Sequence, residues 1–133
     1  MMKKDNSGKQ YEKLSTEVFK YINRNHNFAK VEHDVKLCGL DIDRQIDVLI
    51  THDLEPCKML TIVECKDHNR VISIATVDNL LSVMKDVNAQ RAIIVTRKGY
   101  SNGAKKKAKR VGILLFTLDE AKSEDWEFIK QAP

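Results

Sequence analysis

The stretch QIDVLITHDLEPCKMLTIVECKD, residues 45–67, decides how this chain is expected to fold. Two apolar runs, 45–51 and 59–66, flank HDLEPCK, a polar segment with a proline that suits the loop of a hairpin. Asp47 lies within the first run, and Glu64 and Lys66 end the second. Because unpaired charges are costly to bury, we expect these three side chains to have partners or a chemical role.

Alternate residues of a strand share a face, so Glu64 and Lys66 are predicted to project together. If the two strands pair as a hairpin, Asp47 lies beside Glu64. Neighbouring carboxylates repel unless a cation bridges them, and Mg²⁺ prefers oxygen ligands. A lysine beside the ion can orient a water that attacks phosphorus. The simpler interpretation is a salt-bridge network on a solvated strand end, which would be preferred for E-x-K alone.

Hydrophobic periodicity predicts an α/β fold of the order α-β-β-β-α-β-α-β, with a mixed central sheet and helices on both faces. Outside the hairpin we expect helices over 8–26, 74–87 and 104–111, and strands over 29–37, 91–96 and 113–117. The first helix has an apolar stripe formed by Tyr11, Leu14, Val18, Tyr21 and Ile22. The strand over 29–37 alternates, with one face formed by Val31, His33, Val35 and Leu37.

Composition indicates one domain spanning residues 1–133, with 42% hydrophobic and 32% charged residues. Residues 1–8 are expected to be flexible, and 119–133 to form a tail. No apolar run approaches the ~20 residues that span a bilayer, and the polar start lacks a signal sequence. We therefore expect a cytoplasmic protein without a membrane partner. Three scattered cysteines fit neither a disulfide framework nor a zinc site, and no glycine-rich phosphate loop is present.

The positive charge is concentrated in RKGYSNGAKKKAKR, residues 97–110, which holds seven basic residues and no acidic one. The rest of the chain holds 16 basic and 19 acidic residues. Such a local field favours a polyanion-binding surface, although a lysine-rich helix face is often only solvated. Ala104, Ala108 and Val111 are expected to face the core. The candidate DNA-binding residues are Lys98, Ser101, Asn102, Lys105, Lys106, Lys109 and Arg110.

RQIDVLI (44–50), VECKD (63–67), DVNAQRAIIVTRKGYSNGAKKKAKRVGI (86–113) and YEKL (11–14) together resemble the Mrr-like branch of the PD-(D/E)XK nuclease superfamily. The resemblance extends to about residue 118. It implies that Asp47, Glu64 and the backbone carbonyl of Cys65 bind Mg²⁺, with Mn²⁺ as a substitute, and that Lys66 is the catalytic lysine. The catalytic acid of the first helix matches Glu12, with Glu17 as a rival. Ile46 stands where many members have proline.

The resemblance implies a restriction-endonuclease-like fold and a Mg²⁺-dependent DNA endonuclease, of either restriction or junction-resolving type. The alternative is a non-catalytic DNA-binding or assembly module that retains the fold, and an RNA-directed nuclease is a third reading. His68, Asn69 and Arg70 directly follow the motif and are expected to line the site. Cutting both strands calls for two active sites, so we expect a homodimer, with specificity supplied by the dimer, a separate subunit or a further domain.

Overall fold

The computed structural model describes residues 3–26, 28–66 and 70–117. Its elements follow the predicted order: α1 (Lys3–Ile22), β1 (Ala29–Cys38), β2 (Asp43–Asp53), β3 (Lys58–Lys66), α2 (Ile74–Asp86), β4 (Arg91–Thr96), α3 (Asn102–Val111) and β5 (Leu114–Thr117). Within these residues no helix is both long and apolar enough to cross a membrane. The predicted tail, residues 119–133, lies outside the described residues.

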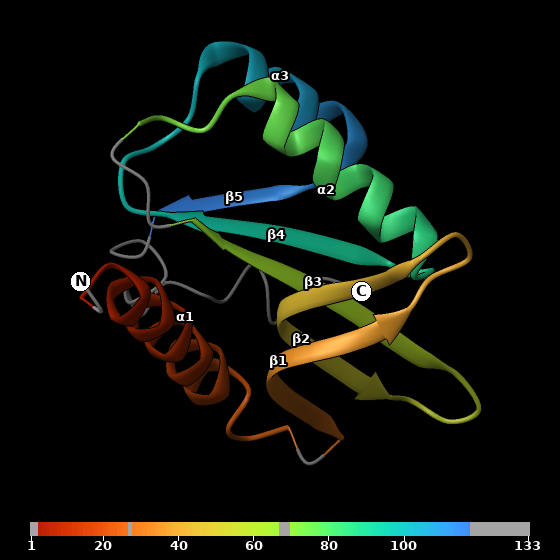
Figure 1. Cartoon of the computed structure of the whole chain (residues 1–133). Helices are drawn as coiled ribbons and strands as arrows, with labels where there is room; N and C mark the ends of the chain where they lie inside the picture. Colours follow the sequence, from red (N-terminus) through yellow and green to blue (C-terminus); the bar gives the residue numbers. More distant parts are fainter. Residues whose placement is uncertain (1–2, 27, 67–69, 118–133) are drawn as a thin grey trace.

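The five strands form one mixed sheet in the order β1-β2-β3-β4-β5. The first three strands pair antiparallel, and β3, β4 and β5 pair parallel, so their carboxyl ends meet at one edge of the sheet. Helix α1 covers one face, and α2 and α3 cover the other (Figure 1). Burial on both faces explains why β4 reads as the continuous apolar run RAIIVT.

Helix α1 differs from its prediction in its ends and in its buried face. It begins at Lys3 rather than at residue 8, because the polar segment before residue 8 offers no apolar period to read. It ends at Ile22, where the amide and side chain of Asn23 both donate to the carbonyl of Phe19. Leu14 and Tyr21 are exposed. Tyr11 is buried as predicted, and the other buried residues are Ser15, Thr16 and Phe19.

Small side chains at the buried face of α1 let the helix lie close to the sheet. Ser15 is fully buried and its hydroxyl contacts the thiol of Cys65 on β3. Burial is the main reason that the pKa of Cys65 rises to about 12, against the opposing effect of the Ser15 hydroxyl, so the thiol stays protonated. Apolar periodicity does not count a serine as a buried position. The predicted apolar stripe was therefore rotated about the helix axis relative to the face that is buried.

Strand β1 also changes face, which the alternating pattern did not predict. Val31 packs on the α1 side of the sheet, whereas Val35 and Leu37 pack on the α2 side. Asp34 lies between them in the left-handed backbone region, with a φ of 58°. Aspartate tolerates this region better than most residues because its short polar side chain can bond locally. The prediction of a single face for residues 31, 33, 35 and 37 is therefore wrong.

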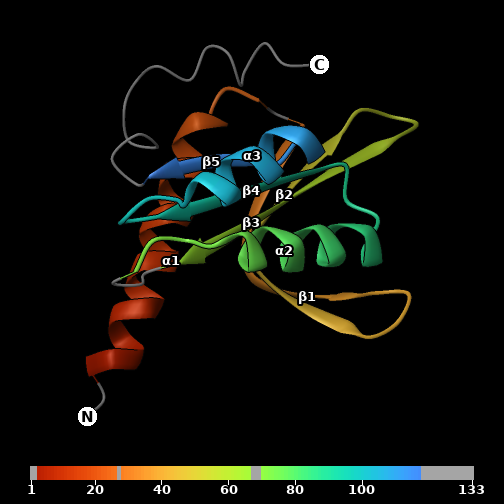
Figure 2. The same cartoon turned by 90° about the horizontal axis from the view of Figure 1, so that it is seen from above.

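The turn of the β1–β2 hairpin lies beside the end of α2 (Figure 2). Asp86, the last residue of α2, joins the two by hydrogen bonds. The carboxylate of Asp86 accepts hydrogen bonds from Arg44 Nε and from the amide of Asp41, each at 2.8 Å. These bonds, the one from Arg44 above all, hold the pKa of Asp86 below its ordinary value. Gly39 is needed beneath them, because a Cβ there would overlap the Asp86 carboxylate.

Candidate active site

The predicted acidic residues meet where β2 and β3 part. The antiparallel ladder between these strands ends at the pair Val48 and Val63, and Asp47 and Glu64 are the next residues on each strand. Asp47 Oδ2 accepts a hydrogen bond of 2.8 Å from the amide of Cys65. The expectation that the hairpin brings Asp47 beside Glu64 is confirmed by this register.

Strand β2 changes its packing at the same point as β1. Val48 packs on the α1 side of the sheet and Ile46 on the α2 side. The ladder pairs His33 with Val48 and Val35 with Ile46, so Asp34 lies opposite Asp47. Asp34 Oδ1 accepts a hydrogen bond of 2.6 Å from Gln45. The crossover of both strands thus places two aspartates at one end of the β2–β3 ladder.

Asp47 sits in a strongly acidic environment. Burial is the largest reason that its pKa rises from 3.8 to about 6, and the negative charges of Glu12 and Glu64 add to the rise. The Cys65 amide and the Lys66 ammonium oppose it. A half-buried carboxylate surrounded by other carboxylates is a position at which a bound cation would be stabilised.

Glu64 and Lys66 project together, as the strand period predicted. Lys66 Nζ lies 3.3 Å from Glu64 Oε2, and their side chains are only 31% and 21% exposed. Among the described residues Glu64 Oε2 accepts no well-aligned hydrogen bond, although it is buried. The ion pair of the simpler interpretation is therefore present, but it lies in a half-buried cluster rather than on a solvated strand end.

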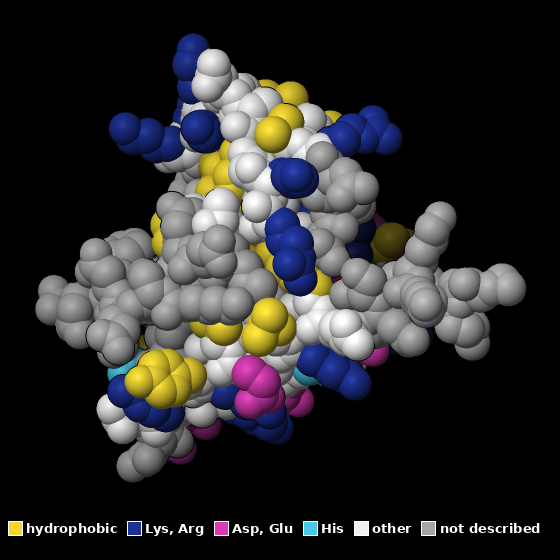
Figure 3. Space-filling view, turned by 90° about the vertical axis from the view of Figure 1, so that its left-hand side faces the viewer, with side chains coloured by type: hydrophobic (Ala, Val, Ile, Leu, Met, Phe, Trp, Pro, Cys, Tyr) yellow, Lys and Arg dark blue, Asp and Glu magenta, His cyan; other side chains and the backbone are white. Residues whose placement is uncertain are grey.

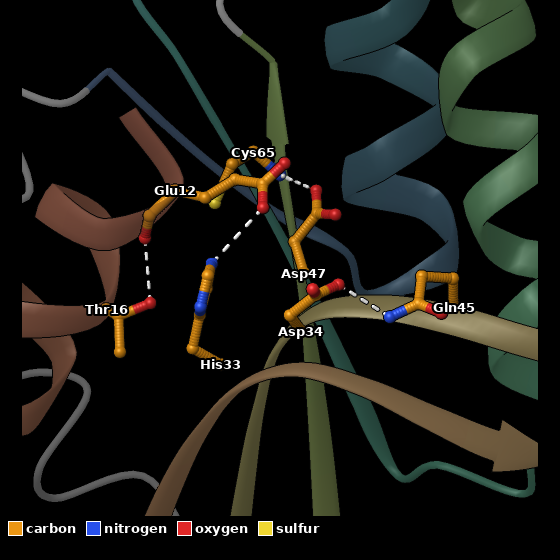
Figure 4. A network of polar contacts seen from close by, with 7 residues as sticks. All are labelled: Glu12, Thr16, His33, Asp34, Gln45, Asp47 and Cys65. Atoms are coloured by element: carbon orange, nitrogen blue, oxygen red, sulfur yellow. Dashed lines mark hydrogen bonds and ion pairs between the residues drawn. The ribbon is translucent and has the colours of Figure 1, made fainter. Parts of the chain in front are cut away.

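Figure 4 shows that α1 contributes Glu12 to this cluster, on the side facing Asp47 and Cys65. Glu12 Oε1 lies 3.2 Å from Nε2 of His33, a residue of β1. The rival acid, Glu17, is 70% exposed and pairs with Lys20 at 3.6 Å. Between the two acids left open by the sequence, the geometry brings Glu12 and not Glu17 to the cluster.

The predicted DNA-binding residues lie on the loop after β4 and along α3. Figure 3 looks onto the left-hand side of Figure 1, where β3, β4 and β5 finish, and it shows Lys and Arg side chains in its upper half and also in its lower half. On α3, Ala104 and Ala108 are buried as predicted, and four basic residues are exposed: Lys105, Lys106, Lys109 and Arg110. Lys98 and Asn102 are exposed as well.

The ends of α3 are formed by residues that the sequence marks as helix caps. Ser101 is half-buried, and its hydroxyl accepts a hydrogen bond from the amide of Ala104, which makes it the N-cap. Gly112 closes the helix in a left-handed conformation, with a φ of 82°. Lys107 turns away from the exposed basic residues and pairs with Asp78 of α2 at 3.2 Å. The exposed charges are therefore held on one rigid element.

The sequence did not single out His33 as a site residue. It was read only as one position of an alternating strand, and no motif marks it. Arg70 is exposed at the end of the segment that follows β3. His68 and Asn69, also expected near the site, lie outside the described residues.

This arrangement of elements defines a restriction-endonuclease-like α/β fold, with a mixed sheet and an acidic cluster where two of its strands part. The family model of the Mrr_cat restriction endonuclease domain matches residues 4–122. The chain therefore belongs to the Mrr_cat restriction endonuclease family. No curated protein gives a significant sequence match.

Solved structures share the fold at low sequence identity. Can2 from Sulfobacillus thermosulfidooxidans, solved with cyclic tetra-adenylate, is 15% identical with a TM-score of 0.72, covering 92% of this chain and 35% of that chain. The protein of unknown function AF1548 is 23% identical with a TM-score of 0.64, covering 80% and 59%. The restriction endonuclease MspJI, solved with a 27-mer oligonucleotide, is 14% identical with a TM-score of 0.63, covering 89% and 27%. The chain thus spans at most 59% of these solved chains.

Proposed function

We propose that this chain is a Mg²⁺-dependent endonuclease domain that hydrolyses phosphodiester bonds of DNA. The observation that carries the proposal is the convergence of Asp47, Glu64 and Lys66 at the end of the β2–β3 ladder. Membership of the restriction endonuclease family supports the reaction class. Restriction and junction resolution remain two settings for this same chemistry.

The donor set suits a hard divalent cation. Glu64 Oε2 is buried without a well-aligned hydrogen bond among the described residues, and Asp47 has a raised pKa in a field of negative charge. Within the same residues no group of three or more His, Cys, Asp or Glu side chains is placed to hold a metal. In this proposal Asp47 and Glu64 would be two protein ligands of Mg²⁺, or of Mn²⁺ in its place, and the Cys65 carbonyl and oxygens of water and phosphate would complete the coordination.

The site residues have distinct parts in the proposed reaction. When bound, Mg²⁺ would supply positive charge that offsets the charge developing on the phosphate in the transition state. Lys66 orients the attacking water by donating a hydrogen bond from its ammonium group. Glu12, whose charge acts on Asp47, adds a carboxylate that can accept a proton from a water in the site.

The exposed basic residues support a nucleic acid as the substrate. Lys98 and Asn102 follow β4, at the end of the molecule where β3 and β4 finish, and the four exposed cations of α3 continue from there along the helix toward the start of β5. Contacts from such residues reach phosphates, which fix the position of a duplex without reading its sequence. Ser101, which caps α3, places the first amides of the helix where a phosphate can also be held.

The proposed metal dependence is tested by incubating supercoiled plasmid with the protein in Mg²⁺, in Mn²⁺ and in excess chelator. We expect cleavage with either ion and none with chelator, and Glu64→Gln should be inactive while it stays folded. The control variant is Glu17→Gln, because Glu17 is exposed and away from the cluster. Cleavage that persists in excess chelator would refute the metal-dependent mechanism. A parallel RNA substrate separates the DNA-directed from the RNA-directed activity.

A further inference from the structure

His33 makes a contact with the acidic cluster from a strand that carries none of the motif residues. Its Nε2 lies 3.2 Å from Glu12 Oε1, across 21 residues of sequence. The side chain of His33 is 25% exposed and that of Glu12 is 19% exposed, so the contact lies in a half-buried environment. An ionised carboxylate only accepts hydrogen bonds, so the imidazole donates through Nε2–H.

The backbone directs His33 to this place. The left-handed conformation of Asp34 separates the part of β1 that packs on the α1 side from the part that packs on the α2 side. His33 is paired with Val48, whose side chain also lies on the α1 side. Non-glycine residues in left-handed backbone are uncommon and concentrate at functional sites. Figure 4 shows the imidazole rising from β1 toward the Glu12 carboxylate.

We infer that His33 is a positioning residue, which holds the carboxylate of Glu12 toward Asp47 for the reaction. This inference rests on the proposed nuclease function and deepens it. Glutamate has three side-chain torsions, so its carboxylate is poorly placed unless a second group fixes it. The Thr16 hydroxyl bonds the backbone carbonyl of Glu12 rather than its carboxylate, at 2.7 Å. His33, on β1, supplies a donor to that carboxylate from a fixed place on the sheet.

A donor of this kind is expected to matter for rate more than for binding. Groups that orient a functional side chain change activity by about 10- to 100-fold when they are removed. Glu12 lies beside Asp47 and away from the exposed cations of α3, so the affinity for DNA should not depend on His33. Loss of the contact should therefore lower the cleavage rate at saturating DNA while leaving the dissociation constant unchanged.

The test compares His33→Gln with His33→Asn under single-turnover conditions with saturating DNA and Mg²⁺. The side-chain amide nitrogen of glutamine can reach the position of the histidine Nε2, whereas the side chain of asparagine is too short to place its amide nitrogen there. We expect Asn to lose about 10- to 100-fold in rate and Gln to recover most of it. His52→Gln is the matched control, because His52 lies five residues further along β2 than Asp47, in a ring cluster with His26 and Phe28.

A double-mutant cycle separates positioning from general destabilisation. In a Glu12→Gln background, His33→Asn should lower the cleavage rate little further, because each change already disrupts the same His33–Glu12 pair. Equal rates for the Gln and Asn variants, or additive losses in the cycle, would overturn the inference. If the wild type cleaves DNA and the His33→Asn variant cleaves it at the same rate, the role of His33 alone is overturned. A wild-type protein that cleaves nothing overturns the proposed function and this role together.

Discussion

Asp47 links the fold to the proposed chemistry at the scale of a single residue. It follows the last ladder pair of β2 and β3 and bonds the Cys65 amide, so its backbone and carboxylate are fixed before any ion binds. Its pKa of about 6, raised mainly by burial, shows that the folded chain holds this charge at a cost. Residues prepared for a cation are expected to carry such a cost, because the ion offsets it on binding.

This cost predicts how stability depends on pH. The unfolded chain releases the Asp47 proton near 3.8, whereas the folded chain keeps it until about 6. Between these values the folded state binds more protons, so stability is lost as the pH rises. At about pH 7.5 without metal, Asp47→Asn should be more stable than the wild type by at most about 3 kcal/mol.

Urea unfolding at several pH values checks this expectation. The advantage of Asp47→Asn should shrink as the pH falls through about 6 and disappear near 4. Saturating Mg²⁺ should raise the stability of the wild type and leave Asp47→Asn nearly unchanged. A constant difference between the two proteins across the pH range would show that Asp47 carries no such cost.

The sequence was sufficient for Asp47, Glu64 and Lys66 because strand alternation and hairpin pairing are local rules. The same rules failed for His33. Its direction depends on the left-handed conformation of Asp34, and nothing in AKVEHDVKLC marks that residue as a turning point. The choice of Glu12 over Glu17 also needed the packed helix, since both acids fit the periodicity of α1.

At the scale of the elements, α3 is a surface helix whose charges are sorted by face. Ala104 and Ala108 are buried, Lys107 pairs with Asp78 of α2, and the remaining cations are exposed. Ala104 and Ala108 are four residues apart, so the helical period predicts this buried face from the sequence. The ion pair between Lys107 and Asp78 could not be predicted from the sequence, because it depends on how α2 and α3 lie beside each other.

Salt dependence tests whether these exposed charges bind phosphate. Log affinity for duplex DNA should fall with log salt by about 0.9 for each phosphate contact. Replacing Lys105, Lys106 and Lys109 with glutamine should flatten that slope by up to about three contacts' worth, equally for all sequences. Lys107→Gln is the matched control and should leave the slope unchanged. An unchanged slope in the triple variant would mean that this face is only solvated.

The element order was predictable because each strand and helix carries its own period, and most predicted ends fall within two residues of the observed ones. Helix α1 was the exception, since its polar start has no period and its buried face uses Ser15 and Thr16. The hydrogen bond between Arg44 and Asp86 joins segments that are 42 residues apart in the sequence. Long-range polar contacts of this kind have no local sequence signal.

At the scale of the whole molecule, we propose that the active form on DNA is a homodimer. One active site cuts one strand, so a chain of 133 residues most simply cuts a duplex with two copies related by two-fold symmetry. Specificity would then come from the dimer, from a separate subunit or from a further domain. The three solved chains named above are each longer than the part that matches this chain.

Sedimentation with and without a short duplex tests the stoichiometry. We expect two protein chains per duplex, and linear plasmid as a product of concerted cutting. A single chain per duplex, with nicked circles as the only product, would contradict the dimer and leave the proposed active site in place.

The most direct measurement compares the wild type with Lys66→Ala on supercoiled plasmid in Mg²⁺, with DNA affinity and melting temperature determined on the same preparations. Lys66 lies 3.3 Å from Glu64 and is not one of the exposed cations of α3. We predict that Lys66→Ala abolishes cleavage, keeps most of the affinity and stays folded. Cleavage at the wild-type rate by Lys66→Ala, or a change confined to the melting temperature, would contradict the proposed active site.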